Sequence, residues 1–124
     1  MKKRILVIED HEDNRQILRD LLNSAGFDMI EAGNGKEGVA TAISQRPDLI
    51  LMDIQLPIMD GYEATRRIKA NADLSAIPII VITSYALSGD EAKASAAGCD
   101  AYVTKPYSPR DLLAKIRTFL PAAI

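Results

Sequence analysis

The chain has 124 residues, of which 48% are hydrophobic and 26% charged, and its formal net charge is −2. This length suits one domain with a buried core, and the charge lacks the basic excess that nucleic-acid binding usually needs. No stretch approaches transmembrane length, and the apolar stretch after Lys2-Lys3-Arg4 is too short for a signal peptide. We therefore expect a single cytoplasmic domain over residues 1–124 that binds neither nucleic acid nor membranes.

The first half of the chain alternates apolar runs with segments in which apolar residues recur at helical spacing. Strands are expected at Ile5–Ile8, Phe27–Glu31 and Leu49–Met52. The first helical segment carries Ile17, Leu18, Leu21, Leu22 and Ala25 and ends at Gly26. The second spans Gly35–Arg46, with Val39, Ala42 and Ile43 on one side and Pro47 at its end.

The second half continues this alternation. A short helix is expected at Gly61–Ala70, with Tyr62, Thr65 and Ile68 facing inward, and strands at Ile79–Ile82 and Ala101–Thr104. Between these strands, Gly89–Ala97 begins with Ser88 and Glu91 at capping-box spacing but offers mostly alanines for packing. The last helix, Pro109–Leu120, has Ser108 as its cap and Asp111 completing the box, and it would bury Leu112, Leu113, Ile116 and Phe119.

Alternating strands and helices predict βαβ units around a parallel sheet. The first, third and fourth strands are apolar at every position, which is typical of strands covered by helices on both faces. We therefore predict an α/β fold, a doubly wound (βα)5 arrangement with a parallel five-stranded sheet in the flavodoxin-like order 2-1-3-4-5.

Four chemically active side chains follow separate strands of this predicted sheet, namely Asp10, Asp53, Thr83 and Lys105. In parallel sheets, ligands bind outside the carboxyl ends of the strands, so these side chains should meet at one edge. Crowded carboxylates repel one another and require a cation, and Mg²⁺ is the hard ion that joins carboxylates to phosphate oxygens. A carboxylate can attack phosphorus, and Asp53, on the central strand, is the best candidate nucleophile.

Each of these residues also has a purely structural explanation. Asp10 could cap the first helix, Asp53 could stabilise the turn that follows it, Thr83 is an ordinary strand residue and Lys105 could be solvated. The joint placement of all four at one end of the strands favours the functional interpretation. The lone His11 and the lone Cys99 have no partners at metal-site spacing, so we expect a solvated loop histidine and an inert thiol.

Four segments in the right order resemble the response-regulator receiver domain of two-component signalling, the CheY-like family, over almost the full length. They are Val7-Ile8-Glu9-Asp10, Leu51 to Gly61 around Asp53, Ile82-Thr83-Ser84 and Tyr102-Val103-Thr104-Lys105-Pro106. The resemblance implies a single-domain response regulator without an effector domain. It would be a phosphoprotein that assists its own phosphorylation and autodephosphorylation rather than an enzyme with a released product.

The resemblance also assigns roles to individual residues. Asp53 would be the phosphoacceptor, and Mg²⁺ would be held by Asp10, Asp53 and the backbone carbonyl of Gln55, with Glu9 beside these ligands. Lys105 would pair with the phosphoryl group, and the Lys105–Pro106 peptide bond would be cis.

A conformational switch is implied as well. On phosphorylation the Thr83 hydroxyl would move toward the phosphoryl oxygens and Tyr102 would rotate inward, biasing a two-state element. Gln55 and Tyr85 are expected to tune the phosphoryl lifetime. Ser84 stands where receivers of this family usually carry Ala or Gly.

The implied partners are a sensor histidine kinase or histidine phosphotransfer protein as phosphodonor and a downstream protein. The downstream protein would bind the face formed by the fourth helix, the fifth strand and the fifth helix.

Three other functions conflict with particular residues of the sequence, and a fourth stays open. A flavin mononucleotide binder conflicts with the acidic loop Glu9-Asp10-His11-Glu12-Asp13, which would repel the phosphate. A phosphatase with an aspartyl-phosphate intermediate would want an acid where Gln55 stands, and a P-loop hydrolase would need a GK[ST] segment that the sequence lacks. The alternative that stays open is a receiver-like interaction module that acts without phosphorylation.

Overall fold

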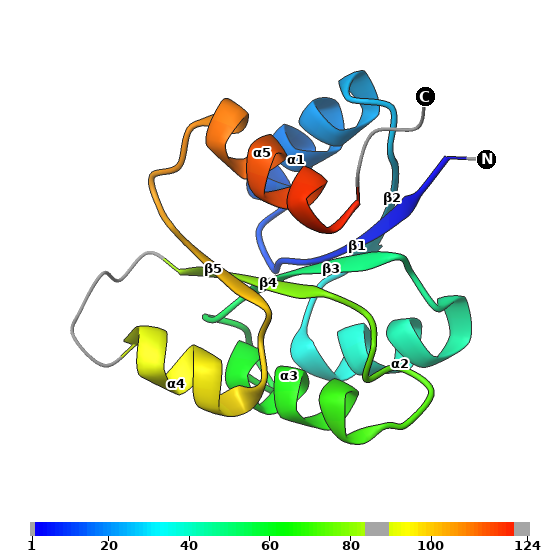
Figure 1. The fold of residues 1–124 in the computed structure, drawn as a ribbon, viewed down its shortest axis with the longest axis vertical. Coiled ribbons are helices and arrows are strands. Elements are labelled where there is room, and N and C mark those ends of the chain that lie inside the picture. Colours follow the sequence, from blue (N-terminus) through cyan, green and yellow to red (C-terminus); the bar gives the residue numbers. More distant parts are fainter. Residues whose placement is uncertain (1, 84–89, 121–124) are drawn as a thin grey trace.

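The computed structural model describes residues 2–83 and 90–120, in which five strands and five helices alternate (Figure 1). The strands are β1 (Arg4–Ile8), β2 (Asp28–Ala32), β3 (Leu49–Asp53), β4 (Ile79–Thr83) and β5 (Ala101–Thr104). The helices are α1 (Glu12–Ser24), α2 (Gly35–Gln45), α3 (Gly61–Ala70), α4 (Asp90–Ala97) and α5 (Pro109–Phe119). The predicted elements are all present, with boundaries shifted by a few residues at most.

The five strands form one parallel sheet in the order β2-β1-β3-β4-β5. Helices α1 and α5 cover one face, and α2, α3 and α4 cover the other (Figure 1). The predicted fold class and strand order are therefore confirmed. Because all strands run the same way, their carboxyl ends share one edge of the sheet.

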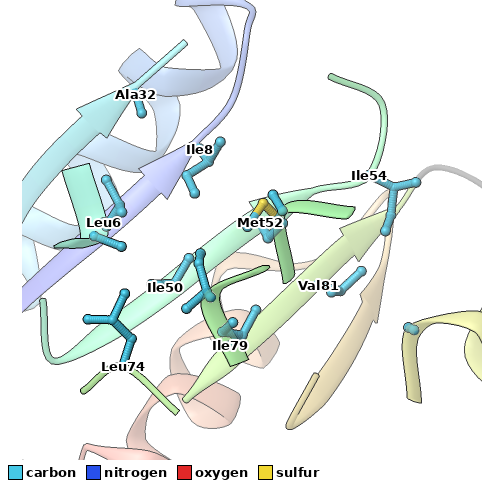
Figure 2. Packing of buried hydrophobic residues seen from close by; sticks show 13 residues of the cluster. Leu6, Ile8, Ala32, Ile50, Met52, Ile54, Leu74, Ile79 and Val81 are labelled. Carbon is cyan, nitrogen blue, oxygen red and sulfur yellow. The ribbon is translucent and has the colours of Figure 1, made fainter. Parts of the chain in front are cut away.

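Two hydrophobic clusters, one on each face, hold the sheet between its helices. Side chains alternate along each strand, so Leu6 and Ile8 of β1 pack toward α2, α3 and α4, whereas Ile5 and Val7 pack toward α1 and α5. Figure 2 shows the first of these clusters around Ile50 and Met52 of β3. Fully burying one such side chain stabilises the fold by about 1.5–3 kcal/mol, so the central strands form a rigid base for the groups at their ends.

Two isoleucines that we expected to pack inward are exposed instead. Ile17 of α1 is 58% exposed and Ile43 of α2 is 49% exposed. In α1 the buried residues are Leu18 and Leu22, one turn apart, and Ile17 lies about 100° away from Leu18 around the helix. In α2 the same offset separates Ile43 from the buried Ala42. The spacing identified both helices correctly but made their buried faces too wide.

The helix starts follow local capping chemistry. Ser108 accepts a hydrogen bond from the Asp111 backbone N–H at 3.0 Å, as predicted for α5. Asn34 and Asp60 cap α2 and α3 in the same way, which the sequence analysis did not anticipate. Ser88, the cap of the box expected with Glu91, lies outside the described residues.

Candidate functional site

The carboxyl edge of the sheet brings together the charged residues that follow β1, β3 and β5. Lys105 Nζ lies 3.1 Å from Asp53 Oδ2 and 3.7 Å from Glu9 Oε2. Burial lowers the pKa of Lys105, but its attraction to Asp53 outweighs this effect and the pKa is raised overall. Lys105 is therefore a fixed ammonium group facing two buried carboxylates.

Glu9 belongs to this group more directly than the sequence indicated. The residue is only 3% exposed, and burial, reinforced by a hydrogen bond with Asp53, raises its pKa to about 7. The His11 backbone N–H and Asn14 Nδ2 donate to Glu9 Oε1 at 3.0 and 3.3 Å, which partly opposes that rise. The site thus holds more carboxylate oxygens than Lys105 alone can neutralise.

Asp10 supplies the observation that bears most directly on a metal ion. Its Oδ1 atom is buried and has no hydrogen-bond partner among the residues that the structure describes. Potential ligand atoms of Glu9, Asp10 and His11 lie within 4.8 Å of one another. A buried carboxylate oxygen without a donor is costly unless a cation binds it, and oxygen ligands suit Mg²⁺. The residues present therefore fit a magnesium ion.

The loop between β3 and α3 is packed tightly against the end of β3, where Asp53 lies. The Gln55 backbone N–H donates to Asp53 Oδ1 at 3.0 Å, which orients this carboxylate. A Cβ atom added at Gly61 would lie 2.3 Å from the Asp53 carbonyl oxygen, and one at Gly35 would lie 2.0 Å from that of Met59. Glycine is required at both positions because backbone occupies the space of a side chain.

Ile58 in the same loop has an unusual backbone conformation. Its φ angle is +70°, a region that β-branched residues rarely adopt, and its side chain is 78% exposed. Neither its conformation nor its exposure is explained by packing in the described part of the chain.

The predicted switch residues lie on neighbouring strands. Thr83 is the last residue of β4 and is buried, and its carbonyl oxygen accepts the Lys105 N–H at 2.6 Å. Tyr102 of β5 is half-buried against the cluster that α2, α3 and α4 form. The Lys105–Pro106 peptide bond is cis, as expected. Ser84 and Tyr85 lie outside the described residues.

A groove of about 540 Å³ opens beside Lys105, between α1 and the start of α5. Its walls are mostly apolar side chains, and Glu9 and Lys105 also line it. The exposed Ile17 and Pro106 and the half-buried Tyr107 contribute to these walls. The groove places an apolar surface directly next to the carboxylates of the site.

The family model of the response regulator receiver domain matches residues 5–117. The chain belongs to this family. The polar-differentiation response regulator DivK of Brucella anthropi is 41% identical over 120 residues, covering 97% of this chain and 98% of that protein. The chain is therefore a regulatory receiver domain of the phosphorelay signalling class.

Solved structures agree with this assignment. The receiver domain of a sensor histidine kinase from Pseudomonas aeruginosa has a TM-score of 0.91 and 34% identity, covering 98% of this chain and 100% of that one. That structure has a magnesium ion coordinated in its active site cleft. Chemotaxis protein CheY4 of Vibrio cholerae has a TM-score of 0.90 and 25% identity, covering 96% of this chain and 99% of that one. In the part of our chain that the structure describes, no helix is long and apolar enough to cross a membrane.

Two residues of α1 contribute to the site without having been predicted. Asn14 donates to Glu9 Oε1, and Arg15 Nη1 donates to the Glu9 carbonyl oxygen at 2.7 Å. Both lie within the first turn of α1, directly after the acidic loop. Their position after that loop is the only sequence signal, and it is weak because polar residues are common on the exposed side of any first turn.

Proposed function

We propose that Asp53 accepts a phosphoryl group in a Mg²⁺-dependent reaction and that this charge change switches a protein-binding surface. The observation that carries the proposal is the buried Asp53 carboxylate beside Lys105, with the unsatisfied Asp10 Oδ1 atom at the same edge. An Asp53 oxygen would form a bond to phosphorus while the bond between phosphorus and the donor's leaving group breaks. The leaving group departs with the bonding electrons and takes up a proton.

The neighbouring residues would divide the remaining tasks. Mg²⁺ bound by Asp10, Asp53 and the backbone carbonyl of Gln55 would supply charge neutralisation for the phosphoryl oxygens. Lys105 would bind the same phosphoryl oxygens from the side of β5. Glu9 would keep the Mg²⁺ ion and the Lys105 ammonium group in place. Gln55 and Tyr85 would set the rate of autodephosphorylation, which the protein itself would assist, and thereby the lifetime of the phosphoryl group.

Thr83 and Tyr102 would transmit the change to a partner. They lie on adjacent parallel strands, where Thr83 pairs with Thr104 and Tyr102 pairs with Val81. Movement of the Thr83 hydroxyl toward a phosphoryl oxygen would draw Tyr102 inward and alter the face formed by α4, β5 and α5. A hollow of about 360 Å³ on this face, lined by Tyr102, Cys99 and Lys115 among others, would change shape with it and present a different surface to a downstream protein.

The phosphodonor would be a sensor histidine kinase or a histidine phosphotransfer protein in the cytoplasm. Receiver domains as a class interact with kinases and downstream proteins. The apolar groove at Ile17 and Tyr107 would offer the phosphodonor protein a binding surface beside Lys105. The organisation of residues 1–124 as a single domain without an effector domain stays a prediction.

Mass spectrometry tests the proposal most directly. The intact protein is incubated with Mg²⁺ and acetyl phosphate, and the wild type should gain one phosphoryl group that Asp53→Asn does not gain. Asp48→Asn is the matched control, because Asp48 precedes the same strand at the opposite edge. An unmodified wild type, with a known receiver domain phosphorylated in parallel, would instead support an interaction module that acts without phosphorylation.

A further inference from the structure

Arg15 connects three parts of the molecule through its guanidinium group. Nη1 donates to the Glu9 carbonyl oxygen at 2.7 Å, Nη2 lies 2.7 Å from Glu12 Oε2, and Nε lies 3.3 Å from Glu31 Oε1. The Arg15 side chain is only 19% exposed, whereas Glu12 is 60% exposed. The hydrogen bond to the Glu9 carbonyl oxygen is partly buried, so it is better shielded from water than the ion pair with Glu12. One side chain thereby ties α1 and β2 to the end of β1.

The main chain of Glu9 is held on both sides by this arrangement. Its N–H donates to the Ala32 carbonyl oxygen at 3.1 Å, at the end of β2, and its own carbonyl oxygen accepts from Arg15. Glu31, the residue before Ala32, anchors Arg15 in turn. The position of Asp10, the next residue along the chain, therefore depends on a clamp built from β2 and α1.

The clamp acts where electrostatic repulsion would otherwise move the chain. Glu9, Asp10 and Asp53 place carboxylates at one edge, and without a cation these groups repel one another. The guanidinium group is rigid and permanently charged, so it can hold a carbonyl oxygen and two carboxylates in fixed directions at once. A flexible single donor would fix fewer of these directions.

We propose that Arg15 is a positioning residue that sets the Mg²⁺ affinity of the site by fixing the main chain of Glu9 and Asp10. The inference rests on the proposed function, because it takes Asp10 to be a metal ligand. Groups that orient metal ligands typically change metal affinity by about 10- to 100-fold when they are removed. We expect an effect of this size on the Mg²⁺ affinity from Arg15, although Arg15 itself would not coordinate the ion.

Arg19 is a closely matched control on the same helix. It pairs with Glu31 at 2.5 Å and with Glu12 at 3.3 Å, the same two carboxylates that Arg15 contacts. Its third contact is with Gln16 at 2.6 Å rather than with the Glu9 carbonyl oxygen. Replacing Arg19 therefore removes comparable ion pairs and leaves the hydrogen bond to the main chain of Glu9 in place.

The experiment is a Mg²⁺ titration of the full chain, followed by amide chemical shifts in NMR spectra, well below each variant's unfolding temperature. Arg15→Met should raise the Kd for Mg²⁺ by about tenfold or more, since methionine keeps part of the stem but donates nothing. Arg19→Met should change the Kd by less than about twofold, although both substitutions lower the unfolding temperature. Arg15→Lys should lie between wild type and Arg15→Met, and it serves as the second test if Arg15→Met does not fold.

Equal Mg²⁺ affinities in the Arg15 and Arg19 variants would overturn the inference and leave the proposed function intact. A wild type that binds Mg²⁺ but gains no phosphoryl group would overturn the proposed function, while a weakened Arg15→Met would still support the positioning role. A wild type that binds no Mg²⁺ would overturn both.

Discussion

Asp48 and Asp100 lie just before β3 and β5, at the opposite edge of the sheet from Asp53 and Glu9, and their surroundings differ sharply. Asp48 accepts the Arg4 backbone N–H at 2.8 Å, and Asp100 accepts the Ile79 backbone N–H at 2.8 Å. Lys69 completes the arrangement with an ion pair to Asp100 at 2.8 Å. At this amino edge, Asp48 and Asp100 each accept a hydrogen bond from the backbone N–H of a residue in or beside a neighbouring strand.

The carboxyl edge of the sheet leaves its charges incompletely matched. Glu9 and Asp53 share the single ammonium group of Lys105, and the Asp10 Oδ1 atom has no partner in the described residues. Ile58 adds a strained backbone at the same edge. Carboxylate side chains therefore stabilise the fold at the amino edge of the sheet, whereas at the carboxyl edge they leave oxygen atoms available to bind a cation.

The largest expected effect is a difference in phosphorylation rate between two lysine variants, one at each edge of the sheet. Lys105→Met should slow phosphorylation by acetyl phosphate by about 100-fold or more, because the phosphoryl oxygens lose a fixed cation. Lys69→Met should leave the rate within about twofold and lower the free energy of unfolding by about 1–3 kcal/mol, because Lys69 also donates to the Ser75 and Ile77 carbonyl oxygens. Phosphorylation rates and urea denaturation measure the two effects, and comparable rate losses in both variants would contradict the distinction.

The next effect concerns the pH dependence of stability without metal. Burial and Asp53 raise the pKa of Glu9 from 4.5 to about 7, so the folded protein binds more protons than the unfolded chain between these values. Stability should therefore fall as pH rises from about 4.5 through 7, by about 2–3 kcal/mol from this group, and level off about one pH unit higher. Urea denaturation in EDTA measures it.

The control for this pH effect is Glu9→Gln, which keeps the shape of the side chain and removes its titration. The difference in stability between wild type and variant should grow toward neutral pH, with the variant gaining. A difference that does not depend on pH would mean that Glu9 titrates normally in the folded protein.

A smaller gain is expected from relieving the strain at Ile58. Left-handed backbone costs an L-residue about 1–2 kcal/mol, and asparagine tolerates it better than a β-branched residue. Ile58→Asn should therefore raise the free energy of unfolding by about 1 kcal/mol. Ile43→Asn is the control, because Ile43 is also exposed but lies in regular helix, where asparagine should give no gain. Destabilisation by Ile58→Asn would show that the isoleucine side chain stabilises the loop.

The last expected effect concerns the reactivity of Cys99, at the amino edge, rather than stability or signalling chemistry. Burial, together with the nearby Asp100 carboxylate, raises the pKa of the thiol, so little thiolate should exist at neutral pH. The folded protein should react with a disulfide reagent at least about tenfold more slowly than the unfolded chain. Because Cys99 is the one cysteine in the sequence, the reaction can be followed without a background. Equal rates in buffer and in denaturant would refute the prediction.

The sequence predicted the fold well because its signals are local and repeated. Apolar runs identified β1, β3 and β4, and the order of polar residues after them located the edge at which Asp53 and Lys105 meet. What it could not predict depends on side-chain direction. The helical spacing of Ile17 fits a buried face, yet its position about 100° around α1 from the buried Leu18 leaves it exposed in the wall of a groove.

The contacts within the site were the least predictable part. Glu9 was expected to sit beside the metal ligands, but its ion pair with Lys105 depends on how two loops from distant parts of the chain meet. Arg15 gave only a weak signal, because an arginine in the first turn of a helix usually points to solvent. Only the three-dimensional arrangement shows that its guanidinium group reaches back to the Glu9 carbonyl oxygen.

The absence of a side chain at Gly61 affects how any mutational survey of this protein should be interpreted. Because a methyl group there would collide with the carbonyl oxygen of Asp53, Gly61→Ala would displace the main chain of Asp53 without touching its carboxylate. A screen that scores signalling output would rank Gly61 beside Asp53 and Lys105 and suggest a chemical role for it. Assays on the folded fraction of each variant are needed to separate residues that react from residues that make room.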